Sequence, residues 1–192
     1  MGATVHHERV RFALGAPLDE ATIDRLTASA RLGDRVLDHV ERRYGAFERS
    51  DARRFATLRD ASLRETAMVR AGLLCHATRL VREIRRDLLA EMAERFGEAS
   101  LRFALASGQG ADGRFTDPAR PVESVLRSGR ACVKAWCDAQ PSEALRRSAI
   151  LACPPGVFQD VDEGDAPANA ADLMDTALRS LEGEALEPEA GR

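Results

Sequence analysis

The sequence predicts a mainly α-helical, single-domain protein, and three observations support this prediction. Apolar residues recur every three or four positions over most of the chain, as they do between residues 122 and 137. Glycines and prolines fall between these segments, where helices are expected to end. Only residues 9–15 alternate between polar and apolar side chains as a strand would. We therefore expect an array of about seven or eight helices, with room for one short N-terminal strand or hairpin.

The first half of the chain contains four predicted helices. Two of them follow Asp19 and Asp34, whose carboxylates can accept hydrogen bonds from the free N–H groups at a helix start. These helices end at Gly33 and Gly45, because glycine readily adopts the conformation that terminates a helix. A third, short helix follows residue 50 or 51. The fourth runs from about residue 60 to residue 84, and its many leucines place it at the centre of the expected core.

Four more helices are predicted in the second half of the chain. They follow Asp87, surround Leu101, follow Pro121 and span residues 143–152, and a glycine- and proline-rich loop covers residues 107–121. The helix after Pro121 carries the only tryptophan of the chain. From the apolar faces of the central helix and of this tryptophan helix we predict seven core residues, which are Leu74, Leu80, Val81, Ile84, Leu126, Val133 and Trp136.

The C-terminal segment differs in composition from the rest. Residues 159–192 contain ten acidic residues against two arginines, a net charge of −8. Within them, residues 169–181 have the apolar spacing of one amphipathic helix. We therefore divide the chain into a helical domain, 1–158, and an acidic C-terminal extension, 159–192. The extension either packs on the domain or orders when a partner offers an apolar groove.

Composition indicates a cytoplasmic protein. The chain has 192 residues, of which 44% are hydrophobic, enough to bury one core. No apolar run approaches the ~20 residues that a membrane-spanning helix needs, and the first residues lack the pattern of a signal peptide. We expect no membrane insertion. The four cysteines lie in or beside apolar helical patterns, which is typical of buried free thiols in a reducing compartment.

Arginines concentrate in one part of the chain. Residues 42–86 contain twelve arginines against five acidic residues. Such a basic region is either a solvated face, a surface for an acidic protein partner, or a surface for nucleic-acid phosphates. The candidate partner-binding residues are Arg79, Arg82, Arg85 and Arg86 on the central helix, and Arg127 and Arg130 on the polar face of the tryptophan helix.

The sequence gives no sign of catalysis, of a metal site or of a cofactor. Residues 108–113 match the spacing G-x-G-x-x-G, but a helix precedes them where a dinucleotide-binding loop needs a strand. Cys75 and His76 are adjacent on a helix and point about 100° apart, so they do not form a dyad. Cys132 and Cys137 lie about 140° apart around their helix, unlike a pair of zinc ligands. We expect a non-enzymatic protein.

Two segments, read in order, resemble a known family. The first contains Gly-Leu-Leu-x-His at residues 72–76, followed by an Ala-Leu step at 104–105. The second contains Gly-x-x-Cys-x-x-x-Trp at residues 129–136, followed by Gln-Pro at 140–141, Leu-x-Arg at 145–147 and a closing proline at 154. This order resembles the SctK family, the YscK, PscK, OrgA and MxiK proteins of the bacterial type III secretion sorting platform. The resemblance covers residues 63–154.

The resemblance implies a specific role. Proteins of the SctK family are cytosolic adaptors that join the inner-membrane ring protein SctD to the SctQ pods. The pods support SctL and, through it, the ATPase. By this resemblance the chain would lie at the cytoplasmic face of the inner membrane and bind SctQ and SctD, with no nucleic acid among its partners.

One alternative function comes from the arginines instead. A helical DNA-binding or regulatory protein could use the arginine-rich residues 42–86, and the two predicted helices in residues 19–44 imitate a helix-turn-helix. Against this, Phe, Trp and Tyr make up only 5% of the chain and its net charge is −3.

Overall fold

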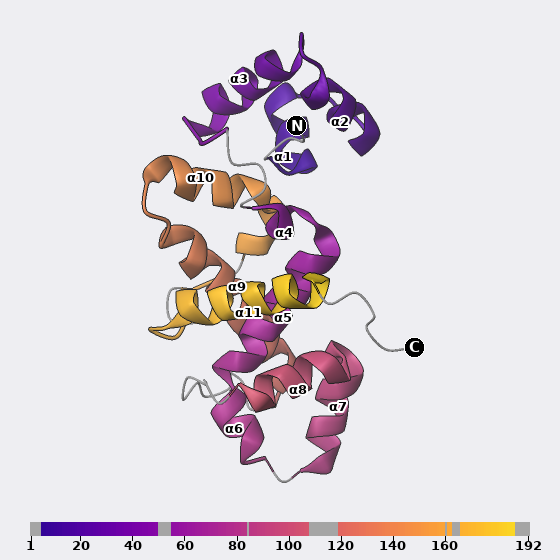
Figure 1. Cartoon of the computed structure of the whole chain (residues 1–192), viewed down its shortest axis with the longest axis vertical. Coiled ribbons are helices and arrows are strands. Elements are labelled where there is room, and N and C mark those ends of the chain that lie inside the picture. Colours follow the sequence, from indigo (N-terminus) through magenta and orange to yellow (C-terminus); the bar gives the residue numbers. More distant parts are fainter. Residues whose placement is uncertain are drawn as a thin grey trace. The chain divides into compact units, whose positions relative to one another are not determined.

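The computed structural model describes residues 5–49, 55–83, 85–107, 119–159, 161–162 and 166–186, with side chains up to residue 182. Within these residues it contains eleven α-helices, one short 3-10 helix and no strand (Figure 1). The prediction of a mainly helical protein is confirmed. The predicted count of seven or eight was too low because the N-terminal segment is helical, the central helix is broken in two, and a further helix forms in the acidic extension.

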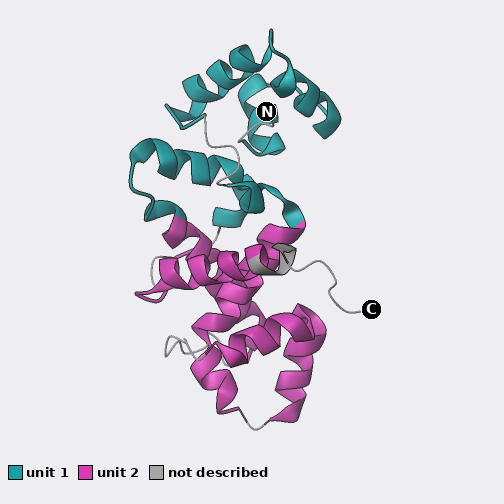
Figure 2. Cartoon of the chain, in the orientation of Figure 1, with its two compact units in different colours: residues 1–61, 137–159 teal, residues 62–136, 160–192 magenta. Residues whose placement is uncertain are grey.

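The chain divides into two compact units (Figure 2). Unit 1 combines Met1–Ala61 with Cys137–Gln159, and unit 2 combines Ser62–Trp136 with Asp160–Arg192. Unit 1 contains α1 (His7–Leu14), α2 (Glu20–Ala28), α3 (Gly33–Tyr44), α4 (Ala56–Arg59), α10 (Glu143–Ala152) and the 3-10 helix η1 (Pro155–Phe158). Unit 2 is built from α5 (Ala61–Cys75), α6 (Ala77–Val81), α7 (Arg86–Phe96), α8 (Glu98–Ala106), α9 (Pro121–Asp138) and α11 (Ala170–Leu186), apart from the first residue of α5 and the last two of α9.

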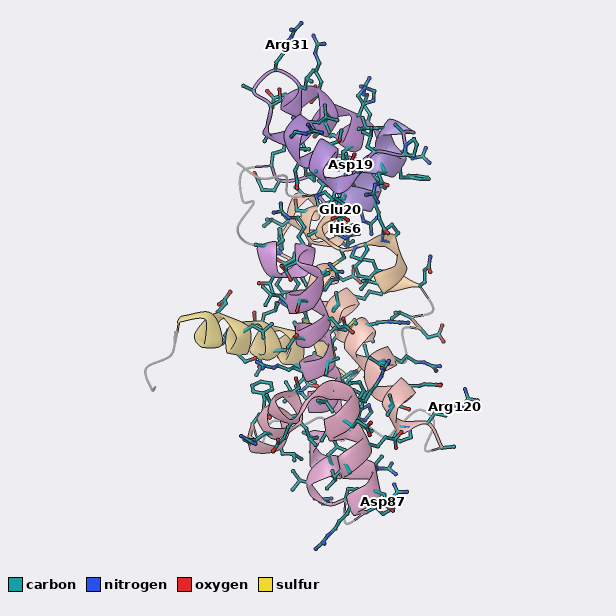
Figure 3. The ribbon with its side chains drawn as sticks, turned by 90° about the vertical axis from the view of Figure 1, so that its right-hand side faces the viewer. His6, Asp19, Glu20, Arg31, Asp87 and Arg120 are labelled. Atoms are coloured by element: carbon teal, nitrogen blue, oxygen red, sulfur yellow. The ribbon has the colours of Figure 1, made fainter. Side chains whose placement is uncertain are left out.

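Unit 1 is centred on three short helices that pack together, α1, α2 and α3 (Figure 1). Asp19 caps α2 as predicted, since its carboxylate accepts a 2.7 Å hydrogen bond from the backbone N–H of Thr22. Figure 3 labels Asp19 and Glu20 at this helix start and Arg31 in the turn that leads to α3. The core of these helices is a cluster of Val5, Val10, Ile23, Val36, Val40, Phe47 and Leu151.

The short strand expected at residues 9–15 is instead the helix α1. Val10 is fully buried whereas Phe12 is 60% exposed and lies beneath the Arg43 guanidinium, 4.7 Å from ring centre to guanidinium carbon. The apolar residues that pack inward are Val10, Ala13 and Leu14, which have helical rather than alternating spacing. Gly15 then ends the helix in the left-handed conformation, at φ 65°. A helix satisfies its backbone groups internally, whereas a single strand needs a neighbour to pair with.

Unit 2 is organised around α5. Every residue from Val69 to Cys75 is buried, on all sides of the helix. A helix that is apolar all round must be covered on every face. Helix α9 covers one of these faces, and α11 packs in the same unit with Leu173, Met174, Ala177 and Leu181 buried. A hydrogen bond of 2.8 Å from Arg70 of α5 to the Ser180 hydroxyl of α11 joins these two helices.

Helices α5 and α9 cross at a pair of glycines. A Cβ atom built on Gly72 would lie 2.2 Å from the backbone oxygen of Val125 in α9. A Cβ atom built on Gly129 would lie 2.2 Å from the backbone oxygen of Met68 in α5. Real Cβ atoms do not approach backbone oxygens this closely, so only glycine at both positions permits this crossing.

We predict that Gly72→Ala destabilises the protein by about 1–3 kcal/mol, because the added methyl group forces α5 and α9 apart. Gly156→Ala is the matched control, since a Cβ there meets nothing closer than 3.9 Å. Thermal unfolding followed by circular dichroism measures both variants. Equal midpoints for the two variants would contradict the close crossing.

Candidate protein-docking site

The predicted arginines of the central helix lie at the corner between α6 and α7. The central helix breaks at His76, α6 ends at Val81, and α7 begins at Arg86. We call Arg79, Arg82, Glu83, Arg85 and Arg86 the arginine corner. Its Arg85 guanidinium donates from Nε and Nη2 to the two carboxylate oxygens of Glu83, at 3.0 Å each.

Glu83 neutralises one arginine of this corner. The side chain of Arg85 first, and then its backbone N–H at 3.0 Å, hold the carboxylate of Glu83 in its charged form. These hydrogen bonds lower the pKa of Glu83 from 4.5 to about 2. Glu83 is therefore ionised at neutral pH.

The remaining predicted arginines differ in exposure. Arg82 and Arg86 are exposed, and within the described residues their side chains have no carboxylate partner. Arg79 is half-buried. Arg127 is exposed and Arg130 half-buried on α9, three residues apart and so on neighbouring positions of one helix surface. The structure thus places the six candidates in two sets, four at the arginine corner and two on α9. Their role in binding stays a prediction.

An apolar groove between α7 and α8 escaped the sequence analysis. Its volume is about 640 Å³, and its lining residues are Leu89, Ala90, Ala93, Glu98, Leu101, Arg102, Leu105 and Ala106. Glu98 and Arg102 form an ion pair of 2.7 Å with each other. The spacing of Leu89, Leu101 and Leu105 predicted helical faces directed at a core. Spacing alone does not reveal that part of such a face stays uncovered, and no other sequence signal marks the groove.

The predicted core residues are partly inside the structure and partly at its surface. Leu74, Leu80 and Val133 are buried, and Leu126 and Trp136 are half-buried. Val81 is 63% exposed, so its prediction as a core residue was wrong. The reason is the break at His76, whose φ of −112° and ψ of 6° end α5, so the helical spacing of α5 does not continue through α6. Ile84 lies outside the described residues.

Several buried polar and sulfur-containing side chains lie where α5 and α9 cross. The imidazole Nε2 of His76 lies 3.1 Å from the hydroxyl of Ser128, and both residues are buried. The sulfur atoms of Cys75 and Cys132 are 3.3 Å apart. The hydrogen bond between Cys132 and Cys75, together with burial, raises the pKa of Cys132, so its thiol stays protonated. These groups fill and fix the crossing.

Neither a metal cluster nor a membrane span is found in the part of the chain that the structure describes. There, no three His, Cys, Asp or Glu side chains are close enough together to hold a metal ion. None of the described helices combines the length and apolarity needed to cross a bilayer. The G-x-G-x-x-G segment at 108–113 lies outside the described residues.

The structure is helical and has two notable surfaces, the arginine corner and the apolar groove between α7 and α8. The chain is similar to the nodulation protein NolU of Rhizobium fredii, with 29% identity over 157 residues that cover 79% of this chain and 70% of NolU. The NolU protein of Sinorhizobium fredii matches to the same extent. No protein-family model and no solved structure matches the chain.

We predict that Arg85→Ala raises the pKa of Glu83 from about 2 part of the way to 4.5, because the strongest interaction is lost while the backbone N–H of residue 85 remains. Carbon-13 NMR of the Glu83 carboxyl group during a pH titration measures this pKa. In the wild type the pKa of Glu83 is lower in the folded protein than in the unfolded chain. The interaction therefore stabilises the fold fully above pH 4.5 and is lost as the pH falls through about 2. Arg102→Ala, whose partner is Glu98, is the control. An unchanged titration of Glu83 in Arg85→Ala would show that the pair does not form in solution.

Proposed function

We propose that this protein is a non-enzymatic adaptor of a bacterial type III secretion system, similar in role to the SctK family. It would link the inner-membrane ring protein SctD to the SctQ pods, and through them SctL and the ATPase, at the cytoplasmic face of the membrane. One observation carries the proposal. The two segments that resemble the family, 72–76 and 129–136, form the two sides of a single helix crossing in unit 2.

The individual motif positions explain why this observation supports the proposal. Gly72 and Gly129 are the positions where α5 and α9 approach most closely. Cys75 meets Cys132, and His76 bonds to Ser128, one residue before Gly129. Residues that are far apart in the sequence thus contact one another where α5 and α9 cross.

The known relatives are compatible with this proposal. Both are rhizobial proteins named for nodulation, which supports a bacterial setting for this chain. The adaptor role itself rests on the resemblance of the α5 and α9 segments. No catalytic residue is assigned.

Docking would be the mechanism of such an adaptor. The helical core is fixed by apolar contacts, whereas exposed charges such as Arg82 and Arg86 are available for reversible contacts with acidic partners. Attachments that depend on exposed charges weaken as salt is added, unlike an apolar interface.

The arginine-rich residues 42–86 give the DNA-binding alternative little support. Their arginines belong to both compact units. Arg49 is held by Asp38 and Glu41, and Arg85 by Glu83. Arg70 is 3% exposed, with its guanidinium carbon 5.1 Å from the ring centre of Phe103. Arginines engaged in these ways are not available for phosphates.

We expect affinity purification of the full chain, from its own bacterium with an assembled secretion system, to recover the SctQ and SctD homologues. A strain that lacks the inner-membrane ring should lose SctD and keep SctQ. Mass spectrometry identifies the proteins, and washing at about 0.5 M salt, where the screening length falls to a few ångströms, should weaken the recovery. Recovery of neither homologue would contradict the adaptor proposal, as would a shift of duplex DNA by the purified protein at low salt.

A further inference from the structure

We propose that the groove between α7 and α8 binds an amphipathic helix of a protein partner. The apolar face of that helix would lie on the groove, and acidic residues at one end would meet Arg82 and Arg86. This inference deepens the proposed function by naming a docking surface and the chemistry of its partner, and it rests on the proposed function only for the identity of that partner.

The shape of the groove suits a helix. Its lining combines three leucines with three alanines, Ala90, Ala93 and Ala106. Small side chains allow another helix backbone to approach closely, and leucines between them offer apolar area. Helices that bind in grooves use apolar side chains at every third or fourth position, and a groove of about 640 Å³ has room for several such side chains.

The arginine corner lies at one end of this groove. Arg86, Leu89, Ala90 and Ala93 are spaced by three and four residues, so they share one face of α7. Arg86 therefore lies one helical turn before the groove-lining residues of α7, on the same face of this helix. Arg86 is the first residue of α7, and α8 follows the opposite end of α7 (Figure 1). Asp87, the neighbour of Arg86, is labelled at the first end (Figure 3).

The charges at this end select an acidic partner. Glu83 already neutralises Arg85, and Glu98 neutralises Arg102 one turn away on α8. Arg82 and Arg86 are exposed and have no carboxylate partner within the described residues. The carboxylates of α7, at Asp87, Glu91 and Glu94, lie about 80–140° around the helix from Arg86, outside the groove face. An apolar surface with the uncompensated Arg86 at one end, and with Arg82 just before it in the chain, complements an amphipathic helix with an acidic end.

Site-specific photo-crosslinking tests this inference in the full chain. Benzoyl-phenylalanine replaces Ala90, which lines the groove, in bacteria that assemble the secretion system. The matched control places it at Ala99, an exposed residue of α8 outside the groove lining. After irradiation, mass spectrometry identifies the cross-linked peptide. The same cross-link is then measured with Arg86→Glu and with Arg86→Lys, after circular dichroism has shown that each variant is folded.

We expect the Ala90 position to cross-link to a partner segment with helical apolar spacing and acidic residues at one end. Arg86→Glu should reduce this cross-link about tenfold, the scale of one lost charge-assisted contact, while Arg86→Lys should largely retain it. Equal yields from the Ala90 and Ala99 positions would overturn the inference. So would a cross-link to a second copy of this chain, a partner segment without acidic residues, or no effect of Arg86→Glu.

The two proposals can fail separately. A cross-linked helix of the expected chemistry that belongs to a protein outside the secretion system would support the groove and contradict the adaptor function. Recovery of the SctQ and SctD homologues, with cross-links absent from the Ala90 position, would support the adaptor function and contradict the groove.

Discussion

The close crossing of α5 and α9 is the constraint on which unit 2 depends. Two backbones approach so closely that each needs a glycine opposite the carbonyl oxygen of the other, at Gly72 and Gly129. Close approach increases the dispersion contacts between the helices and leaves no space for water. The few polar side chains caught at the crossing must then satisfy one another, as His76 and Ser128 do.

This crossing also determines which parts of unit 2 remain free to bind. Because the second half of α5 is buried on all sides, the neighbouring helices use their apolar faces to cover it. Helices α7 and α8 bury Leu88, Met92, Leu101 and Ala104 and leave a second, shallower apolar strip uncovered. Arg86, the first residue of α7, is exposed on the helix face that continues into that strip.

Sequence reasoning succeeded at some helix ends, where a local rule decides the outcome, and failed where packing decides it. The start of α2 followed from the capping chemistry of Asp19, and the end of α3 from Gly45 at φ 90°. The predicted stop at Gly33 and cap at Asp34 were wrong, because α2 already ends at Ala28 and α3 begins at Gly33. The residues of α1 alternate like a strand, yet their burial follows a helix, because the helices α2 and α3 and not a sheet pack against them. Val81 was misplaced because nothing in the spacing reveals the break at His76. The arginines were found by counting charge, but their pairing and the adjoining groove needed coordinates.

The positions of the cysteines have a practical consequence. All four, Cys75, Cys132, Cys137 and Cys153, are buried free thiols. Hydrogen bonds between neighbouring sulfurs and burial raise the pKa of Cys132 and Cys137, which suppresses the thiolate that reacts with maleimides. A single cysteine introduced at an exposed residue would thus accept a fluorescent dye selectively in the native protein. The chain can be prepared for fluorescence studies without first removing its own cysteines.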